Sequence, residues 1–86
     1  MQQFTYVIND PLGLHARPAG LLAKAAKPYA DTVVTITKGD KTVKATQLMK
    51  LMSLAAKNGD EVTVAAEGPA EAEAIAALKK FFEENL

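Results

Sequence analysis

The chain has 86 residues, with ten basic and ten acidic side chains and no cysteine. This length fits a single domain, residues 1–86, with one small core and its chemistry on the surface. Balanced charge argues against nucleic-acid binding, which needs a dense positive field, and the missing cysteines exclude disulfides and thiolate chemistry. We find neither a signal-peptide pattern nor an apolar run near the ~20 residues of a membrane helix, and therefore expect a cytoplasmic protein.

The first third of the chain predicts a strand, a loop and a helix. Phe4, Tyr6 and Ile8 alternate with more polar positions, which indicates a strand over residues 4–8. Residues 9–13, Asn-Asp-Pro-Leu-Gly, are typical of a loop. Residues 16–27 then carry a thin apolar stripe at helical spacing, before a proline that ends the helix. The stripe consists of Ala19, Leu22, Ala23 and Ala26.

The middle of the chain predicts a hairpin and a second helix. Residues 33–37 are rich in β-branched side chains, and a Gly-Asp turn at 39–40 allows residues 42–45 to pair back as a strand. A helical apolar pattern follows and ends at the Asn-Gly pair of residues 58–59. The pattern consists of Leu48, Leu51, Met52 and Ala55.

The last third predicts a strand around residues 62–64 and a final helix opened by the Gly-Pro pair at 68–69. Ile75, Leu78 and Phe82 form the expected buried stripe of that helix. The predicted order is β-α-β-β-α-β-α. This order favours an α+β fold, a two-layer open-faced sandwich with a four-stranded, mostly antiparallel sheet and three helices on one face.

Residues 13–19, Gly-Leu-His-Ala-Arg-Pro-Ala, carry the candidate chemistry. His15, the only histidine, stands where a loop becomes a helix, and the first amides of a helix form a site for anions. A phosphoryl group on His15 would find donors at Ala16 and Arg17, and the Arg17 guanidinium can add charge-assisted hydrogen bonds. A neutral imidazole is a nucleophile, although a lone histidine at such a position is more often a cap or a surface residue.

The same seven residues resemble the active-site signature of HPr, the histidine-containing phosphocarrier of the bacterial phosphoenolpyruvate:sugar phosphotransferase system. The resemblance extends over the whole chain, including residues 50–54, 58–60 and 62–68. It implies that enzyme I phosphorylates His15, in this family at Nδ1, and that the group then passes to the A component of a sugar permease while Arg17 stabilises it. It therefore implies a phosphoryl carrier rather than an enzyme, with no cofactor and no metal.

The resemblance also implies a partner-binding patch. Leu48, Met49 and Met52 match an apolar patch that partners of this family dock against, and Gly20 belongs to the same predicted surface. The alternative is that the methionines fill the edge of the core. Methionine side chains adapt to several partner surfaces, which suits a carrier that meets at least two proteins. We expect a monomer, because a carrier must present the same face to each partner.

Two positions, Gln47 and Leu12, depart from the family pattern. Gln47 stands where many Gram-positive relatives carry a serine that HPr kinase phosphorylates, and it has no hydroxyl, which argues against this regulation. Thr46 could replace that serine as a phosphorylation site or could be the N-cap of the helix, and we favour the cap. Ser53 is a weaker alternative phosphorylation site, because it lies within the helix. Leu12 replaces a small polar residue of some relatives, so support for His15 is absent or comes from Asn9 or Asp10.

Three other functions are alternatives to a sugar phosphocarrier. A paralogue serving a nitrogen-regulatory or other non-sugar branch would share the same motif. A regulatory HPr-like module that carries no phosphate is disfavoured, because His15 and Arg17 are both present. An ordinary enzyme is disfavoured too, because the chain has no second histidine and no cysteine from which to build a common triad or a zinc site.

Overall fold

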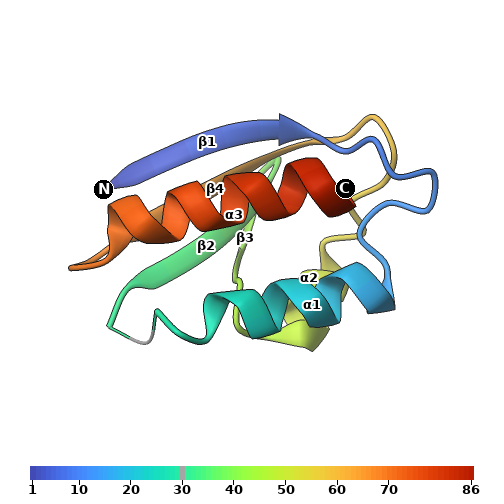
Figure 1. Cartoon of the computed structure of the whole chain (residues 1–86). Coiled ribbons are helices and arrows are strands. Elements are labelled where there is room, and N and C mark those ends of the chain that lie inside the picture. The colour runs from blue at the N-terminus through green and yellow to red at the C-terminus, as the bar shows by residue number, and fades with distance from the viewer. Residues whose placement is uncertain (30) are drawn as a thin grey trace.

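The computed structural model describes residues 1–29 and 31–86 and has the predicted α+β architecture. The four strands form one sheet in the order β1-β4-β2-β3, and all neighbouring strands are antiparallel. The helices cover one face of this sheet (Figure 1). The elements in chain order are β1 (Gln2–Val7), α1 (Ala16–Ala26), β2 (Val33–Lys38), β3 (Lys41–Lys44), α2 (Leu48–Ser53), β4 (Glu61–Glu67) and α3 (Glu71–Asn85).

The sheet has one covered and one open face because apolar and polar side chains alternate along its strands. Phe4 lies opposite Val64 and Tyr6 opposite Val62 in the β1–β4 pair. Ile8, just beyond β1, is fully buried. The predicted inward face of the first strand is therefore confirmed.

α1 buries the predicted stripe of small and aliphatic side chains. The buried residues are Pro18, Ala19, Leu22, Ala23 and Ala26. The small alanines let the helix lie close to its neighbours, and it ends just before Pro28, which cannot continue a helical hydrogen-bond ladder.

α3 is anchored on the sheet mainly through Phe82. Its ring packs edge to face on Phe4 and Tyr6 of β1, with ring centroids 5.7 and 5.5 Å apart, an arrangement that aromatic pairs prefer. Leu78 and Phe82 are fully buried as predicted, whereas Ile75 is only half-buried at the core edge. This anchoring fixes the C-terminal end of α3 beside the loop that follows β1 (Figure 1).

α2 is shorter than the sequence predicts. It ends at Ser53 rather than at residues 58–59, and Ala55 leaves the helix with a φ of 52°. The expected stripe is also wrong in part: Leu51 is buried, but Leu48 and Met52 are 39% and 40% exposed. The chain turns after the helix, and Leu54 and Ala56 are buried there in place of the expected Met52 and Ala55.

The predicted cap of α2 is wrong as well. The N-cap is Gln47, not Thr46, and no side-chain hydrogen bond caps this end among the described residues. The start of the helix is held by backbone bonds instead, since the Gln47 amide donates to the Lys44 carbonyl and the Leu51 amide to the Gln47 carbonyl.

Residues 1–29 and 31–86 contain neither a membrane-spanning helix nor a cluster of metal-binding side chains. No helix there combines the length and the apolar character needed to cross a membrane. Those residues also contain no group of three or more histidine, cysteine, aspartate or glutamate side chains placed to hold a metal ion.

Candidate phosphohistidine site

His15 lies at the junction of the β1–α1 loop and α1. It is the N-cap of the helix, with φ −97° and ψ −174°, and its side chain makes no capping hydrogen bond among the described residues. Its backbone is nevertheless fixed, because its amide donates to the Gly13 carbonyl over 3.1 Å and its carbonyl accepts from the Ala19 amide over 2.9 Å. The half-buried imidazole therefore stands on a hydrogen-bonded backbone and is not used as a cap in the described part of the chain.

The first turn of α1 provides hydrogen-bond donors beside this imidazole. In the described part of the chain, the amides of Ala16 and Arg17 have no backbone acceptor, as expected for the start of a helix. Pro18 has no amide hydrogen, and the described first turn carries no acidic side chain. These two amides and the helix dipole favour an anion at this position.

The loop before His15 is pressed against the segment that follows α2. Gly13 has a φ of 70°, and a Cβ atom there would lie 2.4 Å from the Ala56 carbonyl oxygen and 2.6 Å from the Lys57 Cα. The Leu14 amide donates to the same Ala56 carbonyl over 2.8 Å, and the Leu14 side chain is buried in the core. Only glycine combines this backbone conformation with so close an approach.

His15 and Arg17 line an open surface cleft of about 610 Å³. Its walls come from the β1–α1 loop, the start of α1 and the last turn of α3. Arg17 is its only cationic side chain among the described residues, whereas Asp10 and Glu84 bring carboxylates. The lining residues are Asp10, Pro11, Leu12, His15, Arg17, Pro18, Leu21, Glu84 and Asn85.

Asp10 and Leu12 shape the outer lip of the cleft. The Asp10 carboxylate accepts a hydrogen bond from the Leu12 amide over 2.8 Å, and the Leu12 side chain is 72% exposed. No hydrogen bond joins Asp10 or Asn9 to the His15 ring among the described residues. Asp10 therefore lies in the cleft as a loop-bracing carboxylate, while the side chain of Asn9 is not among the described lining residues.

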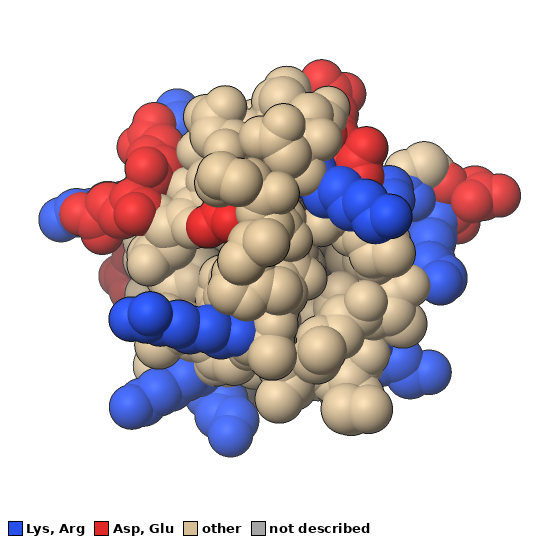
Figure 2. Space-filling view, turned by 90° about the vertical axis from the view of Figure 1, so that its right-hand side faces the viewer, with Lys and Arg blue, Asp and Glu red and all other residues tan. Residues whose placement is uncertain are grey.

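Figure 2 shows the face that lies on the right-hand side of Figure 1, where the β1–α1 loop and the ends of α1 and α3 meet. The middle of this face is mostly uncharged, with acidic and basic side chains around it (Figure 2). This surface can approach an apolar partner without burying many charges, which would cost free energy.

The predicted partner patch is exposed. Met49 is 78% exposed, with Leu48 and Met52 at about half that value, 39% and 40%. The core-filling alternative for these side chains is therefore excluded for Met49. Gly20 is half-buried on α1, and α1 and α2 pack against each other (Figure 1).

The three candidate regulatory positions, Gln47, Thr46 and Ser53, do not line the cleft around His15. Gln47 and Thr46 are exposed where α2 begins, and Thr46 lines a small separate hollow of about 150 Å³. The Ser53 hydroxyl is exposed and donates to the Lys50 carbonyl over 2.7 Å.

Sequence reasoning missed part of the cleft. Leu21, 43% exposed, could have been found, because it falls off the buried stripe of α1. Glu84 and Asn85 had no local signal, because they reach the cleft through the packing of α3 on the sheet and through the bonds from the Asn9 and Asp10 amides to the Leu86 carbonyl.

A match to a known family agrees with this geometry. The family model described as "PTS HPr component phosphorylation site" matches residues 2–84. The phosphocarrier protein HPr of Mycoplasma genitalium is 36% identical over 85 residues, covering 99% of this chain and 97% of the relative. That of Lysinibacillus sphaericus is 40% identical over 77 residues, covering 90% and 84%.

Solved structures agree with this match. A mycoplasma histidine-containing phosphocarrier protein superposes with a TM-score of 0.92 at 36% identity, covering 96% of this chain and 93% of that one. An HPr dimer from Thermoanaerobacter tengcongensis has a TM-score of 0.77 at 38% identity, covering 98% and 95%.

The chain is an open-faced α+β domain whose His15 lines an open surface cleft at a helix N-terminus, and its family match defines the class of phosphocarrier proteins. The chain belongs to the HPr family, the phosphocarrier proteins of the phosphotransferase system. Proteins of this family carry a phosphoryl group and are not themselves catalysts.

Proposed function

We propose that His15 accepts a phosphoryl group from enzyme I and passes it to the A component of sugar permeases. The observation that carries this proposal is the state of the imidazole: it makes no capping bond among the described residues and lines an open cleft with Arg17. A histidine that served only as a helix cap would use its ring in the cap.

The chemistry follows from this position. The lone pair of Nδ1 of a neutral His15 attacks the phosphorus of the donor's phosphohistidine, a P–N bond forms on His15, and the P–N bond of the donor breaks. Onward transfer repeats the step with His15 as the leaving group, so no oxidant or cofactor is required. Phosphoryl transfer needs positioning and charge stabilisation rather than covalent help from other side chains, which suits a shallow surface site.

The phosphoryl oxygens can accept hydrogen bonds from two backbone amides, those of Ala16 and Arg17, and from the Arg17 guanidinium. Asp10 and Glu84 in the same cleft act in the opposite sense, because carboxylates repel a phosphate dianion. A carrier must release its group as readily as it binds it. The mixture of donors and carboxylates keeps the bound phosphoryl group from being held too tightly.

The partners dock on the apolar surface next to the cleft. Leu48, Met49 and Met52 are exposed, and flexible methionines adapt to different partner surfaces. The proposed working form is a cytoplasmic monomer that spans residues 1–86 as one domain. A dimer at cellular concentration, seen by sedimentation, would contradict the monomer without affecting the chemistry of His15.

The test is intact-mass measurement after the chain is mixed with phosphoenolpyruvate and a bacterial enzyme I. We expect the mass to rise by one phosphoryl group that acid removes, and His15→Ala to show no gain. Because the described His15 side chain has no hydrogen bond in the cap, the variant should keep its stability to within about 0.5 kcal/mol.

Other results would change the assignment. No mass gain with several bacterial enzymes I would favour a regulatory module. Transfer with only the enzyme I of a nitrogen-regulatory branch would favour a paralogue of that branch. A large drop in the melting temperature of His15→Ala would show that the histidine is structural.

A further inference from the structure

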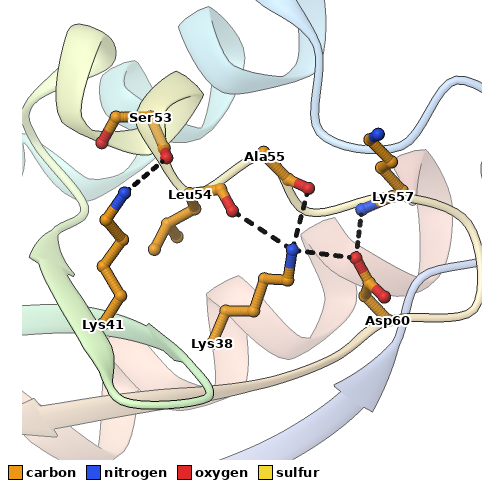
Figure 3. A network of polar contacts seen from close by, with 7 residues as sticks. All are labelled: Lys38, Lys41, Ser53, Leu54, Ala55, Lys57 and Asp60. Carbon is orange, nitrogen blue, oxygen red and sulfur yellow. Dashed lines mark hydrogen bonds and ion pairs between the residues drawn. The ribbon is translucent and has the colours of Figure 1, made fainter.

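Lys38 makes an unusual set of contacts for a lysine next to a hairpin turn. Its ammonium donates to the carbonyl oxygens of Leu54 and Ala55 over 3.3 and 3.0 Å and pairs with the Asp60 carboxylate at 3.1 Å (Figure 3). An ammonium group has three hydrogens, so all of them are used. Asp60 is held in turn by the Lys57 amide over 2.9 Å. The ammonium therefore ties together both ends of the segment formed by residues 54–60.

This segment supports the loop that leads to His15. The Ala56 carbonyl accepts the Leu14 amide over 2.8 Å, and the backbone of residues 56–57 lies against Gly13. The Asn58 side chain donates to the Asn9 carbonyl over 3.0 Å. The Gly59 amide donates to the Ile8 carbonyl over 2.8 Å. Each of these bonds fixes a residue of the chain that leads from β1 to His15.

The segment is irregular, although the Asp60 amide donates to the Lys57 carbonyl over 2.9 Å within it. It contains no helix or strand before β4 begins at residue 61, and Ala55 holds a φ of 52°, a conformation that L-residues other than glycine adopt only when the surroundings enforce it. The Lys38 ammonium binds the carbonyl of this same Ala55. Lys38 thus holds the backbone at residues 54 and 55, which the turn at residues 57–60 does not reach.

We propose that Lys38, paired with Asp60, is a positioning residue for phosphoryl transfer, because it fixes the segment against which the His15 loop is built. The inference rests on the proposed function of His15. Lys38 does not touch the phosphoryl group; it acts through residues 54–60, Gly13 and Leu14 on the placement of the imidazole and of the first helical amides.

Lys41 provides a matched control. It lies at the other end of the same hairpin turn and donates to the Ser53 carbonyl over 2.9 Å (Figure 3). Lys41→Met therefore removes one positive charge and one bond to the end of α2, but no bond to residues 54–60. Lys38→Met removes the same charge together with all three contacts of the ammonium, and keeps the length of the side chain.

The experiment compares these two variants with the wild type in three measurements. They are amide hydrogen exchange at Leu14, the NMR resonances of the His15 ring in the unphosphorylated chain, and the rate of phosphoryl transfer from enzyme I. After correction for global stability, we expect Lys38→Met to speed Leu14 exchange about fivefold and to shift the His15 resonances. Transfer should slow about three- to tenfold, and Lys41→Met should match the wild type.

Lys38→Arg should restore most of the transfer rate, because it keeps the charge and the donors. The inference is overturned if Leu14 and His15 respond no more to Lys38→Met than to Lys41→Met, or if both respond while transfer is unchanged. A wild-type chain that accepts no phosphoryl group would refute the proposed function and the role of Lys38 in transfer. The exchange data would still show separately whether Lys38 holds the loop.

Discussion

Replacing Gly13 by alanine would place a methyl group in the contact between the His15 loop and the segment after α2. The new Cβ would lie 2.4 Å from the Ala56 carbonyl oxygen and 2.6 Å from the Lys57 Cα, so one backbone must move. The φ of 70° adds a cost of about 1–2 kcal/mol for any residue with a side chain. Displacing the loop also weakens the bond between Leu14 and Ala56, worth about 1 kcal/mol.

The expected loss of unfolding free energy for Gly13→Ala is therefore about 2–3 kcal/mol. In a domain of this size that corresponds to a fall in melting temperature of about 10–25 °C. Urea unfolding measures the free energy, and the rate of phosphoryl transfer from enzyme I should fall with it, because the imidazole is displaced.

Gly39→Ala separates the two contributions. Gly39 also has a positive φ, 61°, but a Cβ there would meet no described atom within 4 Å. This variant should lose only the conformational cost, about 1–2 kcal/mol, and keep the transfer rate. If Gly13→Ala is no more destabilising than Gly39→Ala, the close approach at Gly13 does not constrain the loop and our account of its role is wrong.

Two further predictions concern acid stability and the partner patch. The bond from the Lys57 amide, followed by that from the Lys38 side chain, lowers the pKa of Asp60 below its ordinary 3.8, so its stabilising effect is complete above that pH and is lost as the pH falls through the folded-state value. The gap in urea midpoint between wild type and Asp60→Asn should then begin to narrow as the pH falls below about 3.8; a gap that does not vary with pH would contradict this. Met49→Glu should raise the KM for transfer about tenfold at unchanged stability, because this side chain is 78% exposed, and an unchanged KM would remove Met49 from the docking surface.

The fold was predictable where one face of an element is buried along its whole length. The alternation at Phe4, Tyr6 and Ile8 and the stripe of α1 each correspond to a single buried face. The prediction for α2 was wrong for a physical reason. Apolar residues occur on both its buried and its exposed sides, since Leu51 packs inward while Met49 faces solvent, so periodicity could not show which side is the core.

The end of α2 could not be predicted from its own residues. Lys38 and Lys41 reach the carbonyls of residues 53–55 from the β2–β3 hairpin and satisfy groups that a longer helix would have bonded internally. An Asn-Gly pair is a strong stop signal, but here the chain has already left the helix. The Asn58 side chain instead bonds the Asn9 carbonyl of the His15 loop.

The two parts of the site differ in how far the sequence specifies them. The proposed chemical groups lie in a few consecutive residues, His15, Ala16 and Arg17, so a local pattern is enough to suggest them. In our proposal their placement depends on residues 54–60, and the end of α3 lines the same cleft; both are distant in sequence. Substitutions far from His15 should therefore change the rate of transfer without changing its chemistry, and Lys38 and Gly13 are the positions where this distinction can be measured.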